Sequence, residues 1–165
     1  MASSSSDHHH SSLPELLPTP DGHRQCSGCE RVIYNDPKLA VAAIVPLDGG
    51  IVLVRRAIEP AYGKWSFPSG YVNRGEQVER ALEREVLEET ELEVQAGRLV
   101  GLFSDDGGPV VLAVYEAEVV GGSLVAADEA LDAGVFEPHG LPELAFEHDD
   151  RIIRAWQNGL SRQDP

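Results

Sequence analysis

Three glutamates near the middle of the chain, Glu85, Glu88 and Glu89, have the side-chain type and the spacing of a cation site. In a helix, at roughly 100° per residue, these carboxylates lie within about a third of a turn of one another. Carboxylates this close repel each other unless a positive charge lies between them. Ligand sets made only of oxygen suit Mg²⁺ or Mn²⁺. Arg84 is adjacent and could neutralise or orient one of the carboxylates.

The helix that must carry these acids is predicted to begin at Gly75 and Glu76, because neither Pro nor a β-branched run interrupts the residues that follow. Val78, Leu82 and Val86 recur at every fourth residue and therefore form one apolar stripe. The acidic sector overlaps this stripe instead of opposing it, so the carboxylates are expected to point toward the body of the protein. The alternative is a solvated acidic face with Glu–Arg pairs.

The stretch 70–92, GYVNRGEQVERALEREVLEETEL, resembles the Nudix box, a signature of hydrolases that act on nucleoside diphosphates linked to another group. The matching positions are Gly70, Glu76, Arg84, Glu85, Val86, Leu87, Glu88, Glu89, Thr90 and Leu92. The resemblance implies that Glu85, Glu88 and Glu89 bind the metal and that the backbone carbonyl of Gly70 reaches it. It also implies that Glu76 holds Arg84 in place. Glu91 departs from the signature, which has a Gly there to end the helix in a left-handed conformation; that conformation costs other residues roughly 1–2 kcal/mol.

A further acid, Glu129, precedes Phe136 by seven residues. This is where a glutamate of the family often approaches the metals; an exposed loop carboxylate is the other interpretation. A water activated by the metal or by a carboxylate is expected to attack the phosphorus; Glu85 and Glu129 are the two candidate bases, and Arg84 fixes the carboxylates. The sequence does not decide between the two.

Two arginines, Arg55 and Arg56, end a predicted strand, and a guanidinium fork fits two pyrophosphate oxygens. Adjacent strand residues face opposite ways, so we expect at most one of them to face the site, and surface solubility is the alternative for either. The stretch 55–72, RRAIEPAYGKWSFPSGYV, resembles FAD- and ADP-ribose-type Nudix enzymes. Trp65 and Phe67 are expected to anchor it in the core.

Cys26 and Cys29 are the only cysteines and form a CxxC. This spacing brings two thiolates to one zinc ion, and His23, with the run 8–10 of histidines, could complete four ligands. A pair of inert thiols and a redox pair are the alternatives. The segment 26–41 resembles the arm of NADH, FAD and ADP-ribose pyrophosphatases, which often carry a four-cysteine zinc ribbon; only half of that ribbon is present here.

The composition limits the partners. A formal net charge of −15 argues against non-specific nucleic-acid binding, and no apolar run approaches the length of a membrane span. A cytoplasmic protein is the expectation, with a nucleotide-type small molecule as its substrate. Many relatives form homodimers, although no feature of the sequence demands one.

The predicted fold is α/β: an α/β/α sandwich, implied by the resemblance, with a mixed sheet between the box helix and a C-terminal helix. The first 22 residues are predicted to be a disordered, tag-like segment and a Pro-rich linker over 13–21, followed by a CxxC arm over 23–38 and the hydrolase domain over 39–160. The remaining predicted elements are strands at 39–47, 51–56, 92–103 and 109–120, a helical turn at 141–146 and a closing helix at 148–160. His148 is expected to cap that helix or to lie on the surface.

The sequence therefore predicts Mg²⁺- or Mn²⁺-dependent hydrolysis of a nucleoside diphosphate derivative, with ADP-ribose, FAD or NADH favoured. A hydrolase that removes oxidised nucleoside triphosphates uses the same signature and is the alternative within the enzyme class. A non-catalytic ligand sensor is the alternative outside it, but such modules typically lose box carboxylates, and none is lost here.

Overall fold

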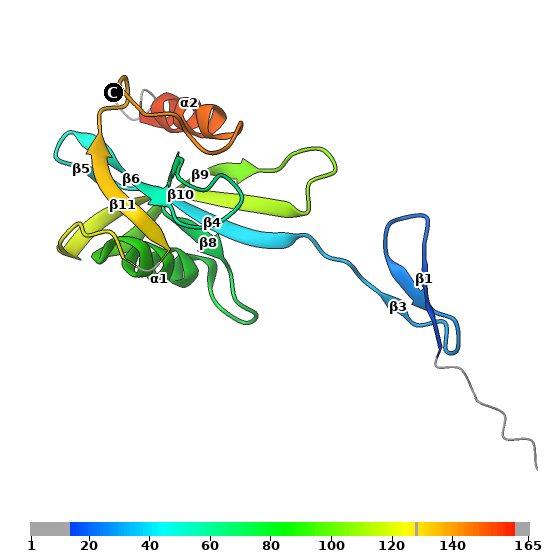
Figure 1. Cartoon of the computed structure of the whole chain (residues 1–165). Coiled ribbons are helices and arrows are strands. Elements are labelled where there is room, and N and C mark those ends of the chain that lie inside the picture. Colours follow the sequence, from blue (N-terminus) through cyan, green and yellow to red (C-terminus); the bar gives the residue numbers. More distant parts are fainter. Residues whose placement is uncertain (1–13, 128, 161–165) are drawn as a thin grey trace, which may run out of the picture. The chain divides into compact units, whose positions relative to one another are not determined.

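The computed structural model describes residues 14–127 and 129–160 (Figure 1). The chain divides into two compact units at the bond between Asp36 and Pro37, and each is described by itself. The predictions of a tag-like segment over 1–12 and of a zinc ligand from the histidines at 8–10 fall outside the described residues.

The first unit contains a small antiparallel sheet in the order β1-β2-β3, formed by Leu16–Pro18, Arg24–Cys26 and Val32–Ile33. The prediction of a linker over 13–21 is wrong at β1, because Leu16 pairs with Cys26 and Pro18 pairs with Arg24. None of the residues described between 14 and 36 is fully buried. This sheet is therefore held by backbone pairing more than by an apolar core.

The second unit contains two sheets of four strands each. The first sheet has the order β8-β4-β10-β9 and is mixed, since β4 and β10 run parallel and the other pairs antiparallel. Its strands are Ser69–Tyr71, Lys38–Ile44, Val110–Gly122 and Leu92–Phe103. The second sheet has the order β11-β6-β5, with β7 also paired to β6. Its strands are Ala130–Phe136, Gly50–Arg56, Pro46–Leu47 and Trp65–Ser66.

Two helices, α1 (Val78–Thr90) and α2 (Asp149–Leu160), lie on opposite sides of these strands (Figure 1). Strand β4 is apolar on both faces, and alternate residues serve the two helices. Val41 and Ala43 belong to the core on the α1 side, whereas Ala42 belongs to the core on the α2 side. The predicted α/β/α sandwich is confirmed, and the long apolar run is explained by a sheet buried on both faces.

The predicted inward stripe of α1 is confirmed, and α2 also turns an apolar face inward. Leu82 and Val86 are fully buried on α1, and Ile152 and Trp156 are buried on α2. No described helix is both long and apolar enough to cross a bilayer.

The predicted start of the first helix is wrong, and so is the predicted helical turn at 141–146. Helix α1 begins at Val78 and not at Gly75, because Gly75 has φ of 84°, a left-handed conformation that a right-handed helix cannot include. The segment 141–146 forms no helical turn; Pro142 lies in it, and Leu144 instead makes an isolated β-bridge with Trp65.

Candidate active site

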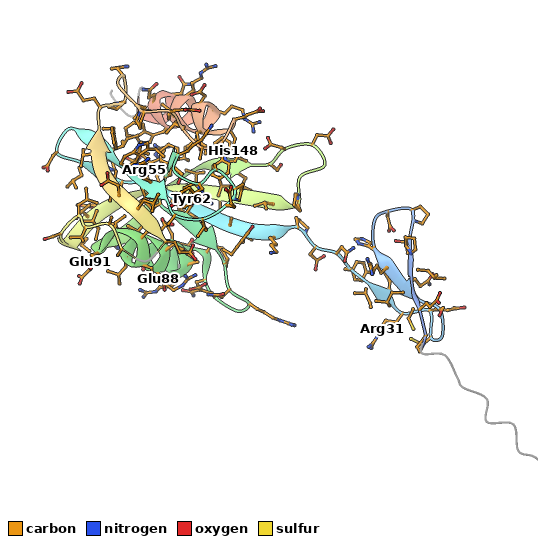
Figure 2. All side chains as sticks on the ribbon, viewed as in Figure 1. Arg31, Arg55, Tyr62, Glu88, Glu91 and His148 are labelled. Atoms are coloured by element: carbon orange, nitrogen blue, oxygen red, sulfur yellow. The ribbon has the colours of Figure 1, made fainter. Side chains whose placement is uncertain are left out.

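The acidic end of α1 faces the protein, as predicted. Glu89 is 9% exposed, and the backbone N–H of Ser69 donates a hydrogen bond to its Oε2 at 3.0 Å. Burial, with the nearby carboxylates of Glu85 and Glu129, raises the pKa of Glu89 to about 8. Burial also raises the pKa of Glu85, whereas Glu88 lies nearer the surface (Figure 2). A buried carboxylate with a raised pKa is one that a cation would stabilise in its charged form.

Arg84 binds several of these acids at once. Its guanidinium donates to Glu76 at 2.9 and 3.0 Å, to Glu85 at 2.7 Å and to Glu88 at 3.0 Å. Glu76 in turn accepts a bond from the backbone N–H of Asn73 at 2.9 Å, and its pairing with Arg84 lowers its pKa to about 2. The contacts match the roles implied for the pair: Glu76 fixes Arg84, and Arg84 fixes the carboxylates.

Gly70 faces the same carboxylates from strand β8. A Cβ added there would lie 2.0 Å from Cδ of Glu85, a distance that no side chain could keep. The backbone at Gly70 therefore approaches Glu85 as closely as only glycine permits. Three carboxylates and the backbone of Gly70 line one cavity, and their oxygens are the kind of donor that divalent cations such as Mg²⁺ prefer, so these residues fit the implied metal.

The predicted metal ligands and Glu129 line one cavity of about 710 Å³. Within residues 14–127 and 129–160, no three acidic, cysteine or histidine side chains are already arranged around a common point for a cation. The hydrogen bonds explain this arrangement, because Arg84 holds Glu85 and Glu88 while the N–H of Ser69 holds Glu89. Arg84 bonds Oε1 of Glu85 and Oε2 of Glu88, so each carboxylate keeps its second oxygen for an ion.

The two arginines of β6 face different ways, as strand alternation predicts. Arg56 lines the cavity, where its guanidinium lies 5.1 Å from the ring centre of Phe146 and its Nε donates to the carbonyl of Pro60 at 2.9 Å. Arg55 is exposed and donates through Nε to the carbonyl of Gly63 at 2.9 Å. Arg56 is therefore the one of the pair that lines the cavity.

The far end of the cavity contains residues that sequence reasoning did not assign to the site. Phe146 and His148 stack with ring centres 5.3 Å apart and planes 7° apart. Asp149 is 2% exposed, and its Oδ2 accepts a bond from the backbone N–H of Phe146 at 3.0 Å. Burial raises the pKa of Asp149. Ser66 lines the same cavity from β7.

A family model described as the NUDIX domain matches residues 36–157. The chain belongs to the Nudix family. The ADP-ribose pyrophosphatase of Methanocaldococcus jannaschii is 39% identical over 77% of this chain and 79% of its own length. The NAD-capped RNA hydrolase NudC of Pseudomonas entomophila is 31% identical over 74% of this chain, which spans about half (51%) of that longer protein.

The Nudix fold is also supported by a solved structure. The crystal structure of a Nudix hydrolase from Nitrosomonas europaea superposes with a TM-score of 0.79, covers 92% of this chain and 89% of its own, and is 23% identical. The predictions of the family, of the fold and of a Nudix hydrolase are confirmed.

Outside the Nudix unit, the structure does not bring His23 to the two thiols. Nδ1 of His23 accepts a bond from the backbone N–H of Asn35 at 3.2 Å, and the ring packs edge-on against Tyr34. Cys26 and Cys29 form no disulfide, and the backbone N–H groups around Cys26 lower its pKa. The prediction of zinc bound by Cys26, Cys29 and His23 together is therefore not supported by the described residues.

The missed residues had weak signals in the sequence. Asp149 and His148 precede the apolar stripe of α2, a place where a polar residue usually caps the helix. His148 directly precedes the helix, where its carbonyl accepts the N–H of Ile152 at 3.1 Å, and the residue also lines the cavity. Only the packing of α2 against β4 and β10 shows that these residues share a cavity with the Nudix box.

Proposed function

We propose that this protein hydrolyses the pyrophosphate bond of ADP-ribose to AMP and ribose 5-phosphate in the presence of Mg²⁺ or Mn²⁺. The relative named ADP-ribose pyrophosphatase carries this proposal, because 39% identity extends over 79% of its length. The cavity supports it, since about 710 Å³ lies within the usual range for small-molecule sites, roughly 300–1,000 Å³. Water adds to one phosphorus, the bridging P–O bond breaks, and the other phosphate leaves.

The cation would be held by the carboxylates of Glu85, Glu88 and Glu89 and by the carbonyl of Gly70. A bound divalent ion neutralises charge on the diphosphate and makes a coordinated water more acidic. The choice between Mg²⁺ and Mn²⁺ belongs to this proposal, because the carboxylate oxygens suit both ions.

The protein groups around the diphosphate have separate tasks. Arg56 binds a phosphate oxygen, and Arg84 keeps the box carboxylates in position through its bonds to Glu85 and Glu88. Either Glu85 or Glu129 takes the proton of the attacking water. Separate Glu→Gln variants at these two positions distinguish them, because loss of the base removes the acidic limb of the pH–rate profile, whereas loss of a ligand also weakens metal binding.

A substrate panel with Mg²⁺ tests the proposal. ADP-ribose, FAD, NADH and 8-oxo-dGTP are offered separately, and the products are separated by chromatography. We expect AMP from ADP-ribose and no turnover of 8-oxo-dGTP. Turnover of 8-oxo-dGTP alone would replace the proposal with removal of oxidised nucleotides, and no turnover of any substrate together with tight binding would favour a sensor.

The variant Glu88→Gln tests catalysis directly, because it removes the ligand charge while keeping the side-chain size. We expect kcat to fall about 100-fold or more with an unchanged circular dichroism spectrum. Glu79→Gln is the matched control on the same helix; Glu79 is exposed and, within the described part of the chain, accepts a bond from the hydroxyl of Tyr115 at 3.5 Å. Equal kcat values for the two variants would contradict the assignment of Glu88.

A further inference from the structure

Ser66 is a polar group of the cavity that the hydrolysis described above leaves unused. Its side chain is 2% exposed, and its Oγ has no hydrogen-bond partner among the described residues. A buried hydroxyl without a partner destabilises a folded chain, and such groups are rare unless water or a ligand completes their bonds. Ser66 belongs to the lining of the cavity, so a ligand that displaces the atoms covering its Oγ can bond to it.

Asp149 is a second polar group at this end of the cavity. Its Oδ2 accepts the backbone N–H of Phe146 at 3.0 Å, which fixes the plane of the carboxylate. Its Oδ1 lies 4.0 Å from Nε2 of His148, too far for a hydrogen bond. Since Asp149 is 2% exposed and lines the cavity, Oδ1 is a buried acceptor that a bound donor group could satisfy.

The surroundings of these two groups are flat and mostly apolar. The aliphatic side chains of Ala42 and Leu112 line the cavity together with the stacked rings of Phe146 and His148. Arg56 lies over the ring of Phe146 and also lines the cavity, so a cation for phosphate adjoins this aromatic end. A planar aromatic group with polar atoms on its edge, attached to a phosphate, has the complementary chemistry, and a nucleobase is such a group.

We propose that Asp149 and Ser66 recognise the base of the nucleotide, with Oδ1 of Asp149 accepting the amino group of adenine and Oγ of Ser66 bonding to a ring nitrogen. This inference rests on the proposed function. A carboxylate accepts and does not donate, so it favours adenine over hypoxanthine, which presents a carbonyl oxygen at the same position. A site built to bond one edge group discriminates strongly against an analogue that lacks it.

The variant Asp149→Asn tests this recognition with ADP-ribose and its hypoxanthine analogue, IDP-ribose. The new amide oxygen still accepts the N–H of Phe146, so the amide NH₂ takes the place of Oδ1 and faces the cavity. The wild type should prefer ADP-ribose, and the variant should shift the ratio of the two kcat/KM values toward IDP-ribose by about 10-fold or more. A variant that slows both substrates by the same factor would overturn the assignment of Asp149.

The variant Ser66→Ala tests the unpaired hydroxyl through two readings. Removal of an unsatisfied buried group should leave the melting temperature unchanged or raise it, while KM for ADP-ribose rises about 3–10-fold with kcat maintained. A fall in melting temperature or an unchanged KM would show that the hydroxyl does not serve the substrate. Ser123→Ala, at an exposed position outside the cavity, is the control.

A failure of base recognition can be distinguished from a failure of the proposed function. If the wild type does not hydrolyse ADP-ribose, the proposed function fails, and base recognition is measured instead by calorimetry with AMP and IMP. Tighter binding of AMP by the wild type, with the preference reduced or reversed in Asp149→Asn, supports the base site without any turnover. Equal affinities for AMP and IMP in the wild type would overturn it.

Discussion

Glu91 ends helix α1 in a conformation that suits glycine, and this makes its replacement a direct test of backbone strain. Its φ is 55° and its ψ is 11°, in the left-handed region. Its N–H still donates to the carbonyl of Leu87 at 2.9 Å. Gly122 lies so close that an added Cβ there would be 2.2 Å from the carbonyl oxygen of Glu91. The carbonyl of Glu91 therefore packs closely against the backbone of Gly122.

The expected increase in the free energy of unfolding for Glu91→Gly is the difference of two effects. A residue with a Cβ loses roughly 1–2 kcal/mol in the left-handed region. Glycine gives back about 0.4–1 kcal/mol because it enlarges the conformational freedom of the unfolded chain. The net stabilisation is about 0.5–1 kcal/mol, which corresponds to a rise in melting temperature of about 1–4 °C for a chain of 165 residues.

Urea denaturation and thermal melting of the wild type and two variants measure this difference. Glu91→Gly should be the most stable, and Glu91→Ala should match the wild type, because alanine removes the charge but keeps the Cβ. Activity should stay within about two-fold, since the helix backbone is the same in all three. A Gly variant no more stable than the Ala variant would refute the argument from strain.

Three further changes have defined outcomes. Gly70→Ala should lower kcat/KM about 100-fold in steady-state assays, because its Cβ displaces Glu85; full activity would contradict the close approach. The pairing of Glu76 with Arg84 stabilises the fold above pH 4.5 and loses its effect as the pH falls toward 2, since the folded-state pKa is lowered from 4.5 to about 2. Glu76→Gln should therefore flatten the urea midpoint over this range, and an unchanged profile would exclude the pair as its cause. Phe67→Ala, at a core position 2% exposed, should lower the free energy of unfolding by about 3–5 kcal/mol in urea titrations, and a loss below 1 kcal/mol would show that the core closes over the gap.

The parts of the fold that follow a local period were predictable from the sequence. The stripe of α1 and the apolar run of β4 both depend on neighbours along the chain; the predicted stripe is confirmed, and the predicted strand is buried on both faces. Strand β1 was not predictable, because the proline content of its segment is typical of a linker. Its pairing with β2 depends on residues further along the chain. The start of α1 was missed because Gly75 adopts a left-handed conformation, which the sequence pattern alone does not distinguish from a helical one.

The residues of the candidate site also fall into a predictable group and a group that the sequence did not indicate. Its box residues were predictable because Gly70 and the helix acids lie within one short stretch of sequence. Ser66 and Asp149 were not, since they are more than eighty residues apart and only the packing of the sheets and α2 makes them line one cavity. The spacing of the box residues carries no information about whether Ser66 and Asp149 bind a substrate.

The charges of the cavity explain why an acidic protein can still take an anionic substrate. Five carboxylates and two arginines line it, an excess of three negative charges when all five acids are ionised. One of the arginines, Arg84, is already bonded to Glu76, Glu85 and Glu88, so Arg56 alone of the pair is turned toward the aromatic end. A diphosphate adds to the negative charge, and one guanidinium does not balance it. The arrangement of acids thus makes sense as a site whose substrate enters together with its cations, because only then do the carboxylates attract the complex that they would otherwise repel.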